Sequence, residues 1–349
     1  MTTKAAFFMT LLTIISVEAG GAVSESDKQP RSPLERLLAG QFEWKASGPL
    51  VSPISDREDP AHAIKDPSVV YYGGKWHLFC TIRSKVRTHN VEYLSFADWK
   101  DANKARRHVL KICEGYYCAP QVFWFEPHKK WYLVYQTANE KLKMHPACST
   151  TENIADPNSW SAPVPLYDQR PANLDGWIDF WVICDDEKAH LFYTDLKGRM
   201  WRAETKLEDF PKGWGQPQVA LQADVFEASH TYKIKGADKY ITVIEAEHKQ
   251  GTRRRYYKAY IADSLDGEWK AIAATPEKPF ASPVNVTDTA QHWTDNFSHG
   301  EFLRSGYDQK LEISPENMRL VFQGMLESEM SRKGYGQLTW RLGLLESVW

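Results

Sequence analysis

The sequence shows no excess of either charge, few cysteines, no long apolar run after its N-terminus and almost no helical periodicity. Its 43 basic and 45 acidic residues give a net charge of −2. Such a balance supplies no basic face for nucleic acid or for an anionic membrane. After residue 16, no stretch approaches the roughly 18 apolar residues of a membrane-spanning helix. We therefore expect a soluble product that binds neither nucleic acids nor membranes and has a neutral partner.

The cysteines are too sparse to form a disulfide scaffold. There are five of them in 349 residues, Cys80, Cys113, Cys118, Cys148 and Cys184. An odd number leaves at least one thiol unpaired, while Cys113 and Cys118 are close enough in sequence to pair locally. Because no CxxC or Cys/His spacing typical of zinc is present, we expect no structural zinc.

Aromatic residues, by contrast, are abundant, with 14 Trp and 16 Tyr. Flat rings with a polar edge stack on the apolar faces of neutral sugars, and they also fill the cores of all-β proteins. Core filling accounts for most of them.

The N-terminus has the features of a secretory signal. A basic residue is followed by an apolar run over residues 5–16 and by a small-x-small pattern that ends at Ala19. We expect residues 1–19 to be a signal peptide and the protein to be secreted and extracellular. Sequons at Asn285 and Asn296 fit a eukaryotic secretory route and predict a glycoprotein.

A repeated strand pattern follows a polar segment. Residues 20–40 are rich in Ser, Gly, Pro and charges, which is typical of a linker or loose N-terminal arm. The repeated β-rich runs are residues 75–79, 130–135, 188–193, 239–243 and 318–322. Each is preceded by another strand-like run, and turn residues separate the two. The repeats predict a single all-β domain over residues 41–349, a five-bladed β-propeller, with a β-sandwich of accidentally similar strands as the alternative.

Acidic residues recur ahead of these runs. In a propeller, the first strand of each blade lines the central channel, so equivalent repeat positions converge at one mouth. Counting back from the repeated runs gives Asp66, Gln121, Asp179, Glu227 and, after a longer insertion, Glu301. A lone acid such as Asp66 is more often a turn former or half of a salt bridge. Asp179 and Glu227 have apolar or aromatic neighbours, an unfavourable place for a charge without a partner or a task. Three acids at matched positions predict one shared site.

Glycoside hydrolysis would use such a group of acids. One carboxylic acid protonates the leaving oxygen, and one carboxylate activates water or attacks the anomeric carbon. A third acid raises the pKa of the proton donor through like-charge proximity. Asp66, Asp179 and Glu227 fit these tasks, and Trp124, Trp177 and Trp181 would supply walls for sugar stacking. A propeller that only binds sugars through these acids is the non-catalytic alternative.

The motifs resemble those of the α-L-arabinofuranosidases of glycoside hydrolase family 62, which are close in fold and catalytic layout to family 43. The similarity occurs in one order at residues 48–53, 65–67, 119–121, 130–136, 176–186, 226–229, 262–267, 298–301, 304–309 and 340–345. Members of family 62 are five-bladed propellers that release arabinofuranose from arabinoxylan with inversion of anomeric configuration. The resemblance implies the same activity here, in a monomer that acts on arabinoxylan. A family 43-like β-xylosidase or arabinanase is the alternative.

The resemblance also implies roles for individual residues. Asp66 would be the general base, Asp179 the residue that tunes pKa and orients, and Glu227 the general acid. An inverting reaction predicts a separation of roughly 6.5–9.5 Å between the base and acid carboxyl groups. The implied arabinose-binding residues are Lys65, Gln121, Trp181, Glu301, Arg304, Tyr307 and Gln323, and those for the xylan backbone are Trp124 and Tyr335. Tyr335 is followed by Gly336, where many members have Asn.

The family often carries a calcium ion in the central channel, held largely through water near the histidine that corresponds to His299. No oxygen-rich loop of the usual calcium type is visible in the sequence. A buried histidine that satisfies a strand hydrogen bond is the other interpretation of His299. No other cofactor is expected.

Overall fold

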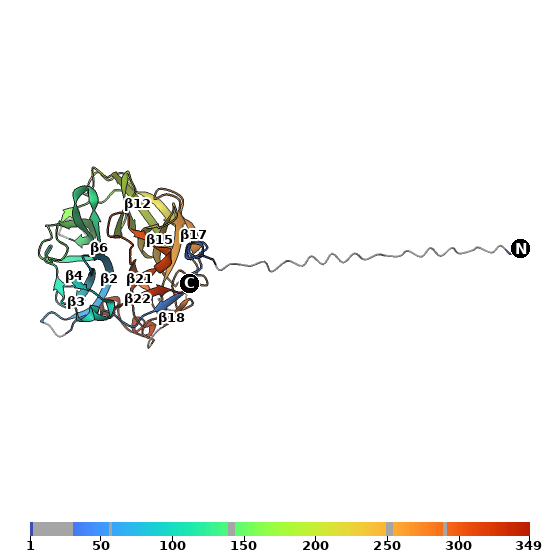
Figure 1. Ribbon diagram of the computed structural model, residues 1–349, viewed down its shortest axis with the longest axis horizontal. Coiled ribbons are helices and arrows are strands. Elements are labelled where there is room, and N and C mark those ends of the chain that lie inside the picture. The colour runs from blue at the N-terminus through green and yellow to red at the C-terminus, as the bar shows by residue number, and fades with distance from the viewer. Residues whose placement is uncertain (3–30, 56–57, 139–143, 249–253, 289–291) are drawn as a thin grey trace. The chain divides into compact units, whose positions relative to one another are not determined.

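A computed structural model describes residues 1–2 and 31–349, apart from 56–57, 139–143, 249–253 and 289–291. One compact unit spans Ser32–Trp349, and its strands form five sheets around a common centre (Figure 1). Among the described residues, no helix is both long and apolar enough to cross a membrane. The signal peptide predicted over residues 1–19 lies outside the described residues except for its first two positions, and it stays a prediction.

Each sheet is one blade, and in the first three the strands pair in chain order. The first blade contains β2 (Ala61–Tyr72), β3 (Lys75–Ser84), β4 (His89–Phe96) and β5 (His108–Val109). The second contains β6 (Tyr116–Phe125), β7 (Lys130–Ala138), β8 (His145–Thr151) and β9 (Val164–Pro165). The third contains β10 (Ile178–Cys184), β11 (Lys188–Thr194), β12 (Arg199–Lys206) and β13 (Gln218–Gln222).

The last two blades each take in a strand from elsewhere in the chain. The fourth contains β14 (Glu227–Ile234), β15 (Tyr240–Glu247), β16 (Arg255–Ala262), β17 (Lys270–Ala273) and, parallel to β14, β20 (Glu312–Ile313). The fifth contains β19 (Ser298–Phe302), β21 (Arg319–Gly324), β22 (Arg341–Ser347), β1 (Trp44–Ala46) and β18 (Val286–Asp288). Because β1 pairs with the C-terminal strand β22, backbone hydrogen bonds close the ring of blades.

The remaining elements are short. They are α1 (Pro33–Leu38), η1 (Trp99–Lys104), η2 (Glu126–His128), η3 (Pro315–Asn317), α2 (Glu327–Met330) and η4 (Tyr335–Gln337). The repeated runs of the sequence lie in β3, β7, β11, β15 and β21, which are the second strands of the five blades, although the last two runs each begin one residue before the strand. The predicted five-bladed propeller is therefore confirmed, and the β-sandwich is excluded.

Helix α1 lies inside the segment 20–40 that the sequence predicts as a linker or loose arm. Ser32 and Glu35 form a capping box that satisfies the free N–H groups of its first turn. Leu37 is fully buried and belongs to the largest core cluster. The compact unit therefore begins at Ser32 rather than at residue 41.

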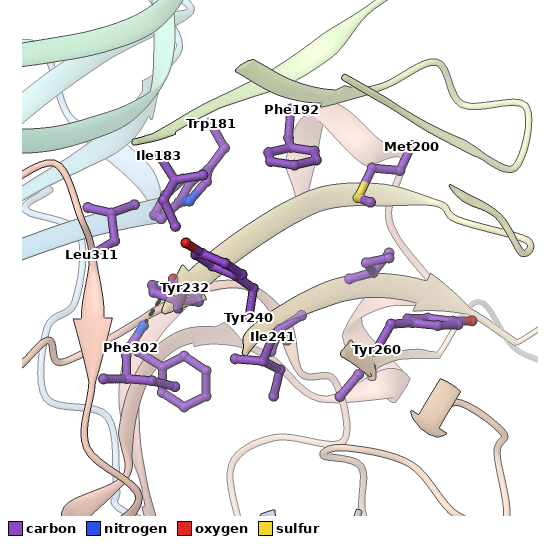
Figure 2. Packing of buried hydrophobic residues seen from close by; sticks show 14 of the residues in the cluster. Trp181, Ile183, Phe192, Met200, Tyr232, Tyr240, Ile241, Tyr260, Phe302 and Leu311 are labelled. Atoms are coloured by element: carbon purple, nitrogen blue, oxygen red, sulfur yellow. Dashed lines mark hydrogen bonds between the residues drawn. The ribbon is translucent and has the colours of Figure 1, made fainter. Parts of the chain in front are cut away.

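Large aromatic side chains fill the space between blades. Figure 2 shows Trp181 from β10, Tyr232 from β14 and Phe302 from β19 in one cluster. The ring of Tyr232 lies 5.5 Å from that of Trp181 and 5.0 Å from that of Phe302, measured between centroids. The Tyr232 hydroxyl also accepts the N–H of Phe302 at 3.2 Å. These rings pack three blades together, as the core-filling interpretation of the aromatic excess predicts.

All five cysteines lie in described residues, and none forms a disulfide. Cys118 donates through its thiol to the Tyr116 hydroxyl at 3.0 Å, while Cys113 lies against Thr137. The local pairing of Cys113 with Cys118 that the sequence allows is therefore absent.

The two sequons differ in accessibility. Asn296 is fully buried, its side-chain amide donates to the carbonyl of Met325, and its Oδ1 accepts the N–H of Arg255. An amide enclosed and bonded on both sides leaves no room for a glycan, so the predicted glycosylation at Asn296 is incompatible with this fold. Asn285 is partly exposed, and its glycosylation stays a prediction.

Candidate functional site

Every inner strand carries a β-bulge at the same level of its blade. Each register contains one extra residue there on β2, β6, β10, β14 and β19. A residue with positive φ stands at each bulge: Asp66 (47°), Ala119 (50°), Asp179 (55°), Ala228 (49°) and His299 (28°). Residues other than glycine rarely adopt this conformation, so its recurrence marks a built-in feature of the repeat. Three of the side chains meet, because His299 Nδ1 lies 3.6 Å from Asp66 Oδ1 and 3.9 Å from Asp179 Oδ2.

The bulges correct the repeat alignment that the sequence suggests. Asp66 and Asp179 are equivalent, since both stand at a bulge. Glu227 comes one residue before its bulge residue, whereas Gln121 and Glu301 come two residues after theirs. Counting back from the second strand drifted by one or two residues because the hairpins between the strands differ in length.

A ring of side chains from the second strands holds the bulges. We call it the acceptor ring, and it consists of Thr81, Gln136, Thr194, Glu245 and Gln323, each paired in register with the residue before a bulge. Across four junctions between blades, the bulge N–H donates to this ring: Asp66 to Gln323 Oε1 (2.8 Å), Ala119 to Thr81 Oγ1 (2.9 Å), Asp179 to Gln136 Oε1 (3.4 Å) and His299 to Glu245 Oε2 (3.0 Å). The backbones of Asp66 and Asp179 are thereby fixed from a neighbouring blade.

The junction between the third and fourth blades departs from this pattern. The buried hydroxyl of Thr194 finds no hydrogen-bond partner among the described residues. The N–H of Ala228 donates instead to Asp179 Oδ2 at 3.1 Å. Asp179 therefore holds the backbone directly after Glu227 with its own carboxylate.

The three carboxylates differ in exposure. The side chains of Asp66 and Asp179 keep 5% and 10% of their surface exposed, and that of Glu227 keeps 18%. Only Glu227 of the three lines a neighbouring pocket of about 410 Å³, together with Phe226, Arg255, Lys333, Tyr335 and Leu338 among others. A ligand in that pocket reaches Glu227 first.

Lys65 places a fixed positive charge beside Asp66. Its Nζ lies 3.5 Å from Asp66 Oδ1 and donates to the Tyr335 hydroxyl at 3.4 Å. Burial opposes the charged ammonium, but Asp66 and Tyr335 outweigh it and hold the pKa of Lys65 well above its usual range. The ammonium therefore stays charged and joins Asp66 to the rim of the pocket at Tyr335.

Glu227 is held in a proton-donating environment. Burial raises the pKa of Glu227 to about 7, although the guanidinium of Arg255, 3.3 Å away, opposes the rise and the carboxylate of Glu245 adds to it. Arg255 pairs with both glutamates, and they keep its own pKa raised despite burial. A carboxyl group with a pKa near neutrality is suited to general acid catalysis.

Asp179 completes the set of coupled acids. Burial, followed by the like charges of Glu227 and Asp66, raises the pKa of Asp179 well above its usual range. Asp179 and Glu227 therefore titrate as a coupled pair, and their pKa values belong to the pair rather than to either residue. A proton donor with a second, buried acid beside it is kept protonated to higher pH, which suits the protonation step of glycoside hydrolysis.

The surroundings of His299 test the predicted calcium ion. Burial lowers the pKa of His299 to about 3, so its ring is neutral, and it packs edge-on against His230 at 4.8 Å. Calcium prefers about six to eight oxygen ligands. Within the described parts of the chain, no group of three His, Cys, Asp or Glu side chains is arranged to hold a metal ion, the group of Asp66, Asp179 and His299 included. The protein groups here do not fit a directly bound ion, and an ion held through water stays a prediction.

Three residues predicted for the sugar pocket lie below it. Gln121, Trp181 and Glu301 are at most 1% exposed. The Gln121 amide accepts the N–H of Val182 and donates to its carbonyl, and Glu301 accepts the N–H of Val69. Their polar atoms join blades to one another rather than line the pocket beside Glu227.

Three further predicted residues lie toward the other end of the inner strands. Trp124 donates its backbone N–H to the carbonyl of Tyr307, whose ring packs against Tyr72 at 5.1 Å. Tyr72 follows Asp66 by six residues on β2, which is roughly 20 Å at the usual rise of an extended strand. Arg304 is buried on the same side and donates to backbone carbonyls of two blades. Of the predicted ligands, Lys65, Gln323 and Tyr335 are the ones that lie with the carboxylates.

Sequence reasoning missed two residues of the site, Glu245 and Arg255. Glu245 is fully buried and accepts both the hydroxyl of Ser298 and the N–H of His299. A signal was present, since Glu245 occupies the same acceptor-ring position as Gln323. Arg255 ends a run of basic residues, 253–255, that reads as a solvated turn.

Comparison with known proteins gives one consistent result. A model of glycosyl hydrolase family 62 matches residues 43–346. Alpha-L-arabinofuranosidase C of Cellvibrio japonicus (strain Ueda107) is 35% identical over 316 residues, which cover 88% of this chain and 47% of that protein. The chain thus spans about half the length of this curated relative.

Solved structures agree in fold. The catalytic domain of a family 62 α-L-arabinofuranosidase from Coprinopsis cinerea is 40% identical with a TM-score of 0.81, covering 88% of this chain and 98% of its own. A family 62 hydrolase in complex with xylotriose is 36% identical with a TM-score of 0.80, covering 88% and 99%. Sequence and fold therefore indicate the same family.

Proposed function

This chain belongs to glycosyl hydrolase family 62, and we propose that it is a secreted α-L-arabinofuranosidase that removes arabinofuranosyl side chains from arabinoxylan with inversion of configuration. One observation carries the proposal. Glu227 is the most exposed of the three acids, lines a pocket and has a pKa raised to about 7. Such a group is suited to protonate the oxygen of a leaving sugar.

Relatives support the choice of substrate. The Cellvibrio japonicus and Coprinopsis cinerea relatives are named α-L-arabinofuranosidases, and another family 62 hydrolase was solved with xylotriose, a short chain of xylose. Tyr335, 46% exposed at the rim of the pocket beside Glu227, offers a ring on which a xylose unit of the main chain would stack.

In the reaction, Glu227 donates a proton to the xylose oxygen as the bond to arabinose breaks. Asp66 takes a proton from a water molecule as its oxygen attacks the anomeric carbon from the opposite face. The water attacks directly, so the sugar is released with inverted configuration. Asp66 is suited to this task because the N–H group bound by Gln323 fixes its backbone and Lys65 flanks its carboxylate.

Asp179 acts on Glu227 rather than on the sugar. The like charges of Asp179 and Glu227 oppose ionisation of both acids at once, as the raised pKa of Asp179 indicates, and the bond from the N–H of Ala228 to Asp179 fixes the backbone next to Glu227. Arg255 opposes this effect and keeps the pKa of Glu227 from rising further.

The test is release of arabinose from wheat arabinoxylan, followed by NMR of the first product formed. We expect free arabinose whose anomer is the opposite of that in the substrate, and a strongly reduced release by the Glu227→Gln variant. If the protein cleaves linear arabinan or xylobiose but releases no arabinose from arabinoxylan, its substrate is not arabinoxylan. If the folded protein hydrolyses none of these substrates, it is a sugar-binding propeller without catalytic activity.

A further inference from the structure

A second pocket lies at the opposite end of the inner strands from the carboxylates. It has a volume of about 640 Å³ and is lined by Tyr71, Trp76, Arg304, Ser305, Tyr307 and Arg319 among others. These residues come from the first and fifth blades. Tyr71 follows Asp66 by five residues on β2, or roughly 16 Å along the strand. The pocket is therefore separate from the site proposed for hydrolysis.

Aromatic rings are unusually exposed here. Among the described residues, the exposed Phe, Trp and Tyr residues are four tyrosines, Tyr71 (48%), Tyr72 (42%), Tyr307 (38%) and Tyr335 (46%). Only Tyr335 lies beside Glu227; the others surround or line this second pocket. The ring of Tyr71 packs at 4.9 Å on Trp76, so the wall is held in place from below. Exposed, fixed rings with polar edges suit the faces of pyranose sugars.

The pocket also has a positive charge that the protein leaves unbalanced. None of its lining residues is acidic. Arg304 is paired with Glu301 at 2.9 Å, whereas Arg319 makes no ion pair with any described residue. The guanidinium of Arg319 lies 5.9 Å from the centre of the Trp76 ring, and its buried Nε has no hydrogen-bond partner among the described residues. Glu346 is its cross-strand neighbour on β22, but no ion pair joins the two side chains. A carboxylate from outside the protein fits this arrangement.

We propose that this pocket binds a hexuronic acid unit of an acidic polysaccharide. The sugar ring stacks on Tyr71 and Tyr307, and its carboxylate pairs with Arg319. The pocket adds a second contact to a polymer whose other part lies at the carboxylate end, and two linked contacts hold a chain more tightly than either does alone. The binding of the uronic acid unit goes beyond the proposed hydrolysis and does not depend on it, whereas the role as a second contact rests on the proposed function.

Binding is measured by retardation in native gels that contain a polysaccharide, using the Glu227→Gln protein so that the polymer stays intact. The probes are glucuronoxylan, the same polymer with its carboxyl groups reduced, and neutral arabinoxylan. We expect glucuronoxylan to be bound more tightly than its reduced form. Tyr71→Ala and Arg319→Ala should each weaken that binding roughly tenfold, as expected for loss of a stacking ring or of a charge-assisted bond. Arg319→Ala should leave binding of the reduced polymer unchanged.

Lys270→Ala, which removes one exposed positive charge from β17, is the matched control and should bind like the parent. Each substitution placed in the active protein should leave hydrolysis of a small aryl arabinofuranoside unchanged, which shows that the fold is intact. Equal retardation of the parent and both pocket variants would overturn the proposal. So would equal binding of glucuronoxylan and its reduced form. Because binding is read on an inactive variant, failure here is distinct from failure of the proposed activity.

Discussion

The junction between the third and fourth blades differs from the other four. At those four, a side chain of the acceptor ring binds the bulge N–H of the next blade. At the exception, Thr194 leaves its hydroxyl unpaired among the described residues, and Asp179 binds the N–H of Ala228 instead. This junction also carries two of the three carboxylates.

The difference shows how a repeat can be adapted to hold two acids at one place. Because Asp179 rather than Thr194 accepts the N–H of Ala228, a carboxylate is bonded to the backbone next to Glu227. Two buried acids repel one another when both are charged, and a backbone N–H stabilises one of them in position. The same bond that joins two blades therefore also sets the relative positions of two acids.

The largest expected effect comes from neutralising the acid at this junction. Glu227→Gln keeps the size and polarity of the side chain but removes its proton-donating group. We expect the rate of arabinose release to fall by about 10²–10⁴-fold, the usual contribution of a general acid. Glu126→Gln, at the other end of the inner strands, is the control and should stay within about twofold. A near-normal rate in Glu227→Gln would place the proton donor elsewhere.

Asp179 allows charge and hydrogen bonding to be separated. Asp179→Asn keeps an oxygen for the N–H of Ala228 but removes the like charge, so Glu227 loses its proton at lower pH. Activity near pH 7 should fall roughly tenfold, since one unit of pKa changes the balance of protonation states tenfold. Asp179→Ala should also lower the free energy of unfolding by about 1–3 kcal/mol, because it leaves a buried N–H unpaired. Rate against pH and urea unfolding measure the two effects. Equal stability of both variants would remove the structural part of this role.

The fold was predictable because its signals are local. The run 188–193 shows strand composition and bounding turns in the sequence itself, and β11 covers it. The group of carboxylates followed from the repeat, although Glu227 stands one residue away from the position equivalent to Asp66. Repetition of short motifs thus predicted which residues meet, but not their exact register.

The rest of the site depends on contacts that linear order hides. Arg255 and Glu245 lie on neighbouring strands, and only the folded sheet brings their charges together. Trp124 and Tyr307 resemble sugar-binding residues by type, but the sequence does not say which end of a strand faces the carboxylates. Burial, which separates Gln121 from Lys65, is likewise a property of the assembled ring.

A matched pair of threonines tests the acceptor ring directly. Thr81 and Thr194 occupy equivalent positions and are both fully buried, but only Thr81 accepts a bulge N–H. Thr81→Val should lower the free energy of unfolding by about 1–3 kcal/mol, because the N–H of Ala119 loses its partner. Thr194→Val removes a hydroxyl that has no partner to lose, and it should be neutral or stabilising. Urea unfolding of both variants decides, and equal destabilisation would mean that the two junctions do not differ.

The smallest expected effect is a shift of the pH profile by the fourth blade's acceptor, Glu245. In the parent, activity should fall as pH rises through about 7, because Glu227 then loses the proton it must donate. Glu245 raises the pKa of Glu227, and Arg255 divides its charge between the two. Glu245→Gln removes the like charge, and Arg255 then forms an ion pair with Glu227 only. Both changes lower the pKa, so the alkaline limb should move down by about half to one pH unit. Glu346→Gln, which changes an exposed residue, is the control and should leave the alkaline limb in place. If the limb stays or moves to higher pH in Glu245→Gln, Glu245 does not raise the pKa of Glu227.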